Sequence, residues 1–238
     1  MSALYLLRHG QAGTRNDYDK LSSLGHKQAR LLGEFLASQK IEFTALFCGA
    51  MRRQRETAQH TIDAFAEAGL TLPPLVTDER WNEFDLGKVY EEIAPPLCDS
   101  DGEFKFGYEE MKASYSDPAA PFHRNSTILD AKVVRAWVSE RFPYSGESWL
   151  EFHSRVVAAL NNLRMFADRG HVAVFTSATP TAISVAYSMG VTDMRAARIA
   201  GMSFNSSIST LRIQPDDFTL FSFNSVPHLE DPVLRSFR

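Results

Sequence analysis

The sequence contains little cysteine, and this scarcity limits the kinds of site that the chain can build. Among its 238 residues only Cys48 and Cys98 are cysteines. They lie far apart and form neither a Cys-x-x-Cys nor a Cys/His pattern, which argues against a disulfide framework and against a zinc site. We interpret both as reduced thiols and expect neither a metal nor a cofactor.

The sequence also lacks an excess of basic residues and any long apolar run. Its formal net charge is −4, so no basic field spans the chain that would attract nucleic acid or an anionic membrane. The apolar N-terminal segment is too short for the core of a signal peptide and has no basic residues before it. We therefore expect a cytoplasmic protein without a nucleic-acid or membrane partner, in which any anion site is built locally.

What the chain does contain is an ordinary globular composition, 44% hydrophobic and 23% charged, in which strand-like runs alternate with helical patterns. Predicted strands cover Ala3 to Leu7, Phe43 to Cys48, His171 to Thr176, and a hairpin of Ser206 to Ile213 with Thr219 to Phe223; Leu70 to Val76 is at best an edge strand. Predicted helices run from Ser22 or Ser23 to about Ser38, and over Met51 to Ala68, Glu147 to Ala167, Pro180 to Ser188 and Thr192 to Ile199.

This alternation predicts an α/β fold with three α/β/α layers around a mostly parallel central sheet. We expect a single domain over residues 1–238, with a helical and loop insertion at about 88–145, where proline, glycine and short helical patterns replace strands. Parallel strands end at a common edge of the sheet. His9, Gly49 and Ser177 follow three of the predicted strands, so we expect them to meet in one pocket.

The most informative segment is Leu7 to Ala12, which reads Leu-Arg-His-Gly-Gln-Ala directly after the first predicted strand. Arg8 can bind a phosphate through two N–H groups, and His9 can attack phosphorus. Gly10 ends the strand and delivers these side chains into the crevice where α/β sheets bind ligands. The segment indicates phosphoryl-transfer chemistry, although an Arg-His-Gly tripeptide alone also arises by chance.

Two further clusters are compatible with that chemistry. Gly49 to Ala58 places three arginines where a strand turns into a helix, and a helix N-terminus favours phosphate; the alternative is that these arginines form a solvated face. Trp81 to Gly87 sets acids beside aromatic residues, where partial desolvation would raise a carboxyl pKa and suit a proton donor. The alternative there is an ordinary solvated loop.

Together and in this order, the motifs resemble those of the histidine phosphatase superfamily, which has a phosphoglycerate mutase-like fold. The matching segments are Arg8-His9-Gly10; Leu21 to Gly25 with Gln28-Ala29; Gly49 to Ala58, similar to Ser-Pro-Leu-x-Arg-Ala-x-x-Thr-Ala; Trp81 to Gly87, similar to Leu-Asn-Glu-Arg-x-x-Gly; and Gly146-Glu147-Ser148 with Arg155. The resemblance covers nearly the whole chain. It implies that His9 is the nucleophile, that Glu83 is the proton donor, and that Arg8 and Arg53 bind the phosphate.

The chain departs from the family pattern at one strand end. The family normally has Ser-His-Gly there, whose histidine is a second cationic partner of the phosphate, whereas this chain has Ser177. We expect Ser177 to be the N-cap of a helix opened by Pro180, so that the backbone N–H groups of Ala178 and Thr179 point into the pocket. Loss of the cation would remove roughly 3 to 4 kcal/mol of transition-state stabilisation, and Ser177→His is expected to raise turnover.

Three functions follow from the resemblance. The first is a phosphomonoester hydrolase that acts on a small phosphorylated substrate through a phosphohistidine at His9, with activity reduced by Ser177 and without a metal. The alternative is a pseudoenzyme that binds phosphate or a phosphorylated ligand. A phosphoglycerate mutase is a weaker hypothesis, because the insertion supplies acids such as Glu91, Asp99 and Glu103 in place of a basic rim.

The sequence allows two interpretations for each of two histidines and for one predicted strand. His123 in the insertion and His228 near the C-terminus are each either an ordinary structural residue or a replacement for the missing cation. The strand Ser206 to Ile213 is either an exposed edge that pairs with a second copy of the chain, giving a homo-oligomer, or a covered one.

Overall fold

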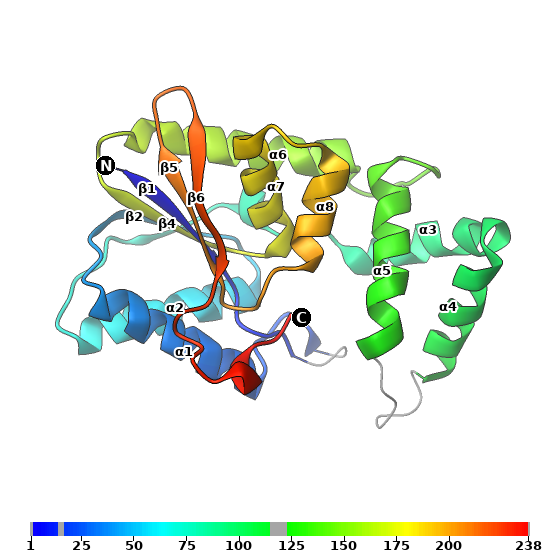
Figure 1. Ribbon diagram of the computed structural model, residues 1–238, viewed down its shortest axis with the longest axis horizontal. Helices are drawn as coiled ribbons and strands as arrows, with labels where there is room; N and C mark the ends of the chain where they lie inside the picture. The colour runs from blue at the N-terminus through cyan, green and yellow to red at the C-terminus, as the bar shows by residue number, and fades with distance from the viewer. Residues whose placement is uncertain (1, 14–16, 115–122, 238) are drawn as a thin grey trace.

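The computed structural model describes residues 2–13, 17–114 and 123–237, and within these ranges a six-stranded sheet lies between helices (Figure 1). The strands are β1 (Ala3–Arg8), β2 (Phe43–Cys48), β3 (Leu75–Thr77), β4 (His171–Thr176), β5 (Ile208–Ile213) and β6 (Phe218–Ser225). The helices are α1 (Ser23–Ser38), α2 (Arg52–Glu67), α3 (Leu86–Ser100), α4 (Gly102–Ser114), α5 (His123–Val138), α6 (Trp149–Asn162), α7 (Ala178–Met189) and α8 (Asp193–Gly201), with short 3-10 helices at Glu79–Trp81, Leu163–Phe166 and Pro232–Leu234.

The strand order is β3-β2-β4-β1-β5-β6. Neighbouring strands from β3 to β1 are parallel, and β5 and β6 add an antiparallel edge. The predicted α/β fold with a mostly parallel sheet is therefore confirmed. Strand β5 lies between β1 and β6, so the interpretation of Ser206 to Ile213 as an exposed edge is wrong: β6 covers it.

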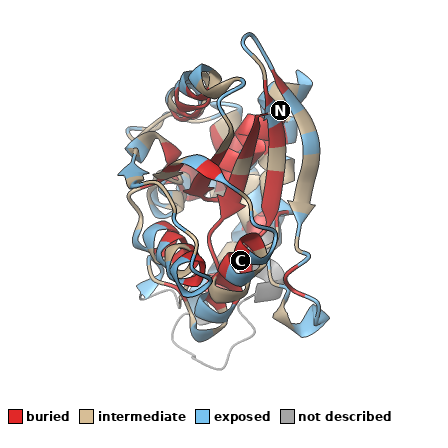
Figure 2. Cartoon of the chain, turned by 90° about the vertical axis from the view of Figure 1, so that its left-hand side faces the viewer, coloured by how far each residue is buried: buried red, intermediate tan, exposed pale blue. Residues whose placement is uncertain are grey.

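Alternate residues of the central strands face two separate cores, because successive side chains of a strand point to opposite faces. Helices α1 and α2 cover one face and α6 and α7 the other (Figure 1), and the buried central strands appear in red in Figure 2. On the α6 and α7 side lie Leu4, Leu6, Val172 and Val174; on the α1 and α2 side lie Leu7, Ala173 and Phe175. This double burial explains why β1 and β4 read as near-continuous apolar runs.

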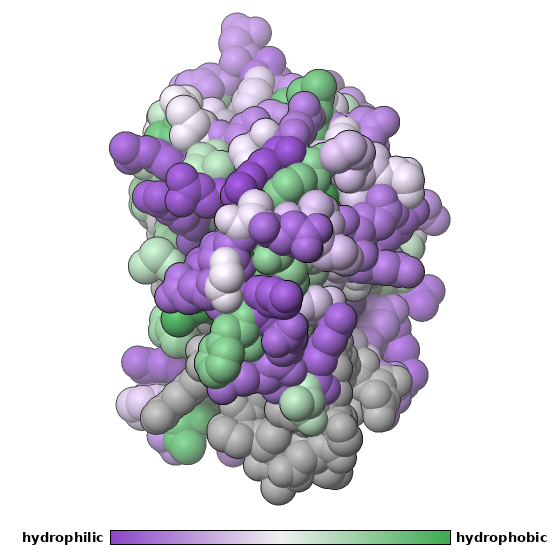
Figure 3. All heavy atoms as spheres, turned by 90° about the vertical axis from the view of Figure 1, so that its right-hand side faces the viewer, coloured by the Kyte–Doolittle hydropathy of each residue, from purple (hydrophilic) through white to green (hydrophobic). Residues whose placement is uncertain are grey.

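Helices α3, α4 and α5 project to one side of the sheet (Figure 1). They fall largely in the region predicted as an insertion, whose described residues form helices without strands. Aromatic stacking joins them to the rest of the chain, since the rings of Phe84 and Trp137 lie 4.5 Å apart. Figure 3 views the molecule from this side, where hydrophilic residues cover most of the surface. No helix in the described ranges has both the length and the apolar character needed to cross a membrane.

Candidate active site

The carboxyl ends of β1, β2 and β4 converge, and the backbone of His9 is fixed at that point from both sides. Its N–H donates to the carbonyl of Thr176 at 2.9 Å, and its carbonyl accepts from Ser206 N at 3.0 Å. The next residue must be glycine, because a Cβ at Gly10 would lie 2.3 Å from the carbonyl oxygen of Gly25 at the start of α1. This close approach holds the loop after β1 against α1.

The imidazole of His9 is 3% exposed and hydrogen-bonded at both nitrogens. Nδ1 lies 2.7 Å from the Gly10 carbonyl, and Nε2 lies 3.1 Å from Nε of Arg53. A carbonyl can only accept and a guanidinium can only donate, so the proton is on Nδ1 and the lone pair on Nε2. Burial, assisted by the positive charges of Arg53 and Arg8, holds the His9 pKa well below its ordinary value. At neutral pH this imidazole is therefore uncharged, with its lone pair on Nε2.

Arg53 is the one arginine of Gly49 to Ala58 that enters the site. It is 5% exposed, and besides the contact with His9 it pairs with Asp19 at 2.8 Å. Arg52 and Arg55 are exposed, and Arg52 pairs with Glu56 along α2. The expected trap of three arginines is thus wrong for two of them, which form the solvated face that was the alternative.

Arg8 is a buried cation with one unused donor. Its terminal N–H groups donate to the carbonyls of Ser203 and Phe237, the latter at 3.3 Å. Its Nε is buried and has no hydrogen-bond partner among the described residues. Burial lowers its pKa to about 10, so the guanidinium remains charged at neutral pH and its free N–H can bind an anion.

Ser177 follows β4 and occupies the N-cap position of α7, as expected, but its side chain does not cap the helix. Helix α7 begins at Ala178, earlier than predicted, and the Ser177 side chain makes no capping bond. Its Oγ instead accepts from Nε2 of Gln54 at 2.8 Å. The backbone N–H of Thr179 donates to Glu83 at 3.0 Å, so the expectation that this N–H is free for phosphate is wrong. Ala178 N–H remains at the N-terminus of α7, directly after Ser177.

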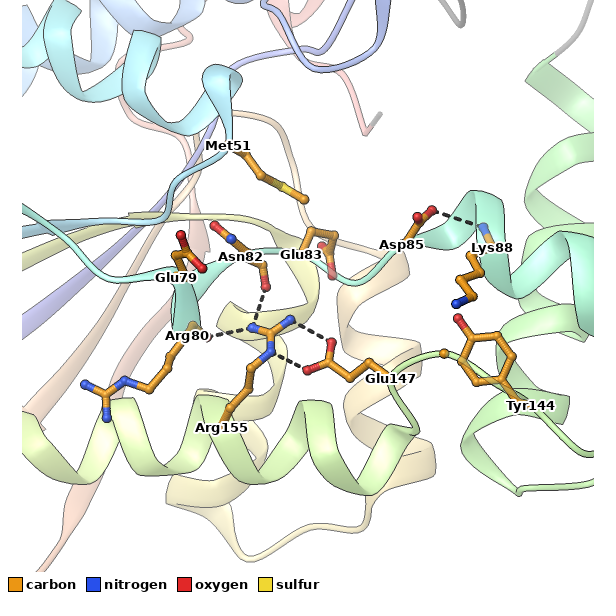
Figure 4. A pocket seen from close by; sticks show the side chains of 11 residues that line it. Met51, Glu79, Arg80, Asn82, Glu83, Asp85, Lys88, Tyr144, Glu147 and Arg155 are labelled. Atoms are coloured by element: carbon orange, nitrogen blue, oxygen red, sulfur yellow. Dashed lines mark hydrogen bonds and ion pairs between the residues drawn. The ribbon is translucent and has the colours of Figure 1, made fainter.

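Glu83 is half-buried and held by backbone donors. Its two carboxylate oxygens accept from Thr179 N at 3.0 Å and from Phe84 N at 3.2 Å. Arg155 fixes the preceding backbone by donating to the carbonyls of Arg80 and Asn82 at 2.8 and 2.9 Å (Figure 4). The Gly146-Glu147-Ser148 motif supports this arrangement, since Glu147 pairs with Arg155 through both oxygens.

A pocket of about 510 Å³ opens beside Glu83 (Figure 4). It is lined by Met51, Glu79, Arg80, Asn82, Glu83, Asp85, Lys88, Tyr144, Gly146, Glu147 and Arg155. Two of its cations are already neutralised, because Arg155 pairs with Glu147 and Arg80 pairs with Asp78. The other charged side chains of the lining are Glu79, Glu83, Asp85 and Lys88. Burial, with smaller contributions from the charges of Glu92, Asp85 and Glu147, raises the pKa of Tyr144 to about 12.

The remaining candidates occupy other places. His228 is 8% exposed and its Nε2 lies 2.8 Å from Oγ of Ser206; burial lowers its pKa to about 4, so this ring does not supply the missing cation. The side chain of His123 lies outside the described residues. In the described ranges no group of three or more His, Cys, Asp or Glu side chains is arranged to hold a metal ion.

The structure also contains site residues that the motifs did not reveal. Asp19 pairs with Arg53, the amide oxygen of Asn82 accepts from Ala50 N at 2.6 Å, and Gln54 contacts Ser177. A signal existed for Gln54 alone: it stands where the family motif has alanine.

Comparison with known proteins identifies the family of the chain. The family model described as "Histidine phosphatase superfamily (branch 1)" matches residues 4–100 and 125–226. The mitochondrial serine/threonine-protein phosphatase Pgam5 of Caenorhabditis elegans is 27% identical over 188 residues, which cover 72% of this chain and 60% of that protein. The 2,3-bisphosphoglycerate-dependent phosphoglycerate mutase of Azorhizobium caulinodans is 30% identical over 67% of this chain and 76% of the relative. In the first three such relatives the match spans between about half and three fifths of their length.

Solved structures share the fold over almost the whole chain. Bacillus stearothermophilus YhfR superposes with a TM-score of 0.66 at 18% identity, covering 97% of this chain and all of that one. A mycobacterial glucosyl-3-phosphoglycerate phosphatase gives a TM-score of 0.61 at 18% identity, with 94% and 98% covered. The family match spans most of the sequence and the architecture agrees, so this chain belongs to the histidine phosphatase superfamily.

Proposed function

We propose that the protein hydrolyses phosphomonoesters through a phosphohistidine formed at His9. The observation that carries the proposal is the uncharged imidazole, buried beside two guanidinium groups with its Nε2 lone pair accepting from Arg53. A lone pair held in place next to fixed positive charge suits attack on a phosphate dianion. Two of the relatives and structural neighbours are named as phosphatases, which supports hydrolysis.

In the first step the phosphate displaces the Arg53 contact from Nε2. Nε2 of His9 then forms a bond to phosphorus while the bond to the ester oxygen breaks. The guanidinium groups of Arg8 and Arg53, with Ser177 and the N–H of Ala178, balance the charge on the phosphoryl oxygens. Glu83 gives its proton to the departing oxygen, which leaves into the pocket beside it as an alcohol.

In the second step Glu83, now a carboxylate, takes a proton from water as the water oxygen attacks phosphorus. The bond between phosphorus and Nε2 breaks, inorganic phosphate forms, and both His9 and Glu83 return to their starting states. The arginines, the hydroxyl and the helix N-terminus supply the positive field throughout.

The test is phosphate release from p-nitrophenyl phosphate and from a panel of small alkyl phosphates by wild type and His9→Ala. We expect His9→Ala to lower kcat/KM by at least about 10⁴-fold, since it removes the nucleophile. Wild-type protein mixed with a 32P-labelled substrate and quenched in alkali should carry acid-labile label, which His9→Ala should lack. Equal background rates for both proteins would refute the proposal.

A second candidate is phosphate recognition without turnover. It is favoured by Arg8, because both terminal nitrogens of its guanidinium already donate to the carbonyls of Ser203 and Phe237 and Nε is the nitrogen without a partner among the described residues. Calorimetry separates the two functions, because this alternative requires phosphate binding by wild type together with neither turnover nor 32P-histidine.

The Azorhizobium relative is named as a phosphoglycerate mutase, but the structure favours mutase activity less than either hydrolysis or phosphate recognition. Its substrate carries a carboxylate and its reaction a second phosphate, and the pocket next to Glu83 offers the unpaired acids Glu79 and Asp85 against Lys88. Like charges in the pocket would repel such a substrate. Conversion of 3-phosphoglycerate to 2-phosphoglycerate by the wild-type protein would reverse this order.

A further inference from the structure

The side of the phosphate site formed by β4 contains a buried amide that the mechanism above does not use. Gln54, in the first turn of α2, is fully buried, and Ser177 is 1% exposed. The Gln54 Nε2 donates to Ser177 Oγ at 2.8 Å and to the Trp81 carbonyl at 3.1 Å. The two residues are 123 positions apart in sequence, so the fold brings them together.

The surroundings fix which way the Gln54 amide faces. The Trp81 carbonyl can only accept a hydrogen bond, so it selects the nitrogen of the amide. The backbone N–H of Met51 can only donate, and it lies 3.2 Å from Oε1. The nitrogen therefore faces Ser177, and the Ser177 oxygen is obliged to accept.

This contact leaves the hydroxyl proton of Ser177 for another acceptor. Among the described residues no hydrogen bond uses that proton. Thr176 pairs with Arg8 in the register of the neighbouring strands β4 and β1, and its carbonyl binds the N–H of His9 at 2.9 Å. Ser177 follows Thr176 as His9 follows Arg8, on strands that lie about 4.8 Å apart. A phosphoryl group bound to His9 would lie within reach of the hydroxyl.

Space for the amide depends on a third residue. A Cβ added at Gly49 would lie 2.0 Å from Oε1 of Gln54 and 2.9 Å from Oδ1 of Asn82, so glycine is required while Gln54 is present. Positions 49, 54 and 177 are also positions at which this chain departs from the motifs quoted above, with glycine for serine, glutamine for alanine and serine for histidine. The three departures form one connected cluster.

We propose that Gln54 is a positioning residue that holds Ser177 as a hydrogen-bond donor to the phosphoryl group, so that this pair replaces the missing cation. The inference rests on the proposed function, because it assigns a role at the same site. It also revises the expected effect of Ser177→His: an imidazole at this position meets the Gln54 amide, so the substitution alone lowers turnover.

The test is a double-mutant cycle of Gln54→Glu and Ser177→Ala, with Gln59→Glu as a matched control on the exposed face of α2. A carboxylate at position 54 has the shape of the amide but cannot donate, so it draws the hydroxyl proton away from the site. We expect each single variant to lower kcat/KM for p-nitrophenyl phosphate about 100-fold, and the double variant to be no worse than either. Losses that multiply would overturn the proposal, since a merely structural Gln54 acts independently of Ser177. If Gln54→Glu does not fold by circular dichroism, Gln54→Met takes its place in the cycle.

A second comparison uses histidine. Ser177→His combined with Gln54→Ala should be at least 10-fold more active than Ser177→His alone, and an equal or lower rate would contradict the proposed pairing. The same proteins titrated with inorganic phosphate separate this inference from the proposed function. If wild type binds phosphate but hydrolyses nothing, the proposed function fails. The cycle of Gln54 and Ser177 variants is then read from the phosphate Kd: effects that do not multiply support the role of Gln54, and effects that multiply refute it. Wild type that binds no phosphate refutes both.

Discussion

The two regions that meet at Glu83 are built on opposite principles. On one side, Arg8, His9 and Arg53 are each no more than 6% exposed, and their geometry is fixed by backbone and by one another. On the other side, the 510 Å³ pocket is open and lined by residues of both charges. Under the proposed function, the buried cations would fix the geometry of the phosphate, whereas the leaving group would meet an open surface that selects mainly by charge.

The buried region is tested most severely by Arg53→Lys. Lysine keeps the charge but lacks the planar fork with which the Arg53 guanidinium can bind two phosphoryl oxygens. We expect kcat/KM to fall about 10³-fold, and by the same factor for p-nitrophenyl and alkyl phosphates. Asp19→Asn, which changes the exposed partner of Arg53, is the control and should alter the rate by only about 2-fold. If the loss of kcat/KM differed between p-nitrophenyl and alkyl phosphates, Arg53 would also act on the leaving group, and the two regions would not have separate roles.

Glu83→Gln tests the residue that lies between the buried cations and the open pocket. Glutamine retains an oxygen for the Thr179 N–H but has no proton to transfer. Steady-state assays should give a loss of about 10²-fold or more for an alkyl phosphate, whose leaving oxygen needs protonation, and less than about 10-fold for p-nitrophenyl phosphate, whose leaving group does not. Equal losses on both substrates would remove Glu83 from the role of proton donor.

The wall behind His9 makes the buried region sensitive to acid. His228 bonds to Ser206, whose N–H binds the His9 carbonyl, and burial lowers the His228 pKa to about 4. Below the unfolded value of about 6.5, the unfolded chain takes up a proton that the folded chain does not. Stability is therefore complete above pH 6.5 and is lost as the pH falls.

For this one group, lowering the pH from 7.5 to 5.5 should cost about 1.3 kcal/mol of unfolding free energy, measured by urea titration. The His9 pKa is also depressed, so the measurement is made in a His9→Ala background. There, His228→Gln should reduce the loss by about 1.3 kcal/mol, while His60 and His171, whose pKa values burial also lowers, leave a residual slope. An unchanged slope in the double variant would assign the acid sensitivity to groups other than His228.

A substitution in the open pocket should change activity less than the substitutions above. Asp85 is exposed and its carboxylate faces the pocket while capping α3, so Asp85→Asn keeps the cap and removes one charge. We expect wild type to prefer phosphoethanolamine over phosphoglycolate, and the variant to narrow that ratio by about 3-fold at low salt. An unchanged ratio would show that the pocket does not select by charge.

Much of the fold was predictable because its signals are local. The apolar runs Phe43 to Cys48 and His171 to Thr176 coincide with β2 and β4, because strands covered on both faces carry mostly apolar residues. Helix α3 was harder to predict from the sequence, because Pro95 and Pro96 lie inside it and proline normally argues against a helix interior. Ser177 was correctly predicted as the N-cap of α7, but the helix was expected to open at Pro180, because proline is typical of the first helical position, whereas it begins at Ala178.

In the site, the residues named by motif were found where strand ends converge, but their partners were not foreseeable. Asp19 reaches Arg53 from a loop, and the Phe237 carbonyl reaches Arg8 across 229 positions. Such contacts depend on loop and tail conformation, for which single residues carry no periodic signal. Whether Arg52 or Arg53 faces inward depends on the rotation of α2 about its axis, which the core residues Ala58 and Phe65 decide.

The pairing of β1 has a consequence for how the chain acquires its activity. Strand β1 lies between β4 and β5, whose residues follow it by more than 160 and 200 positions. Contacts of such sequence separation form late, because a long loop must close first. Because β4 and β5 hold the strand that bears His9, the candidate site is assembled only after these two long-range pairings have formed.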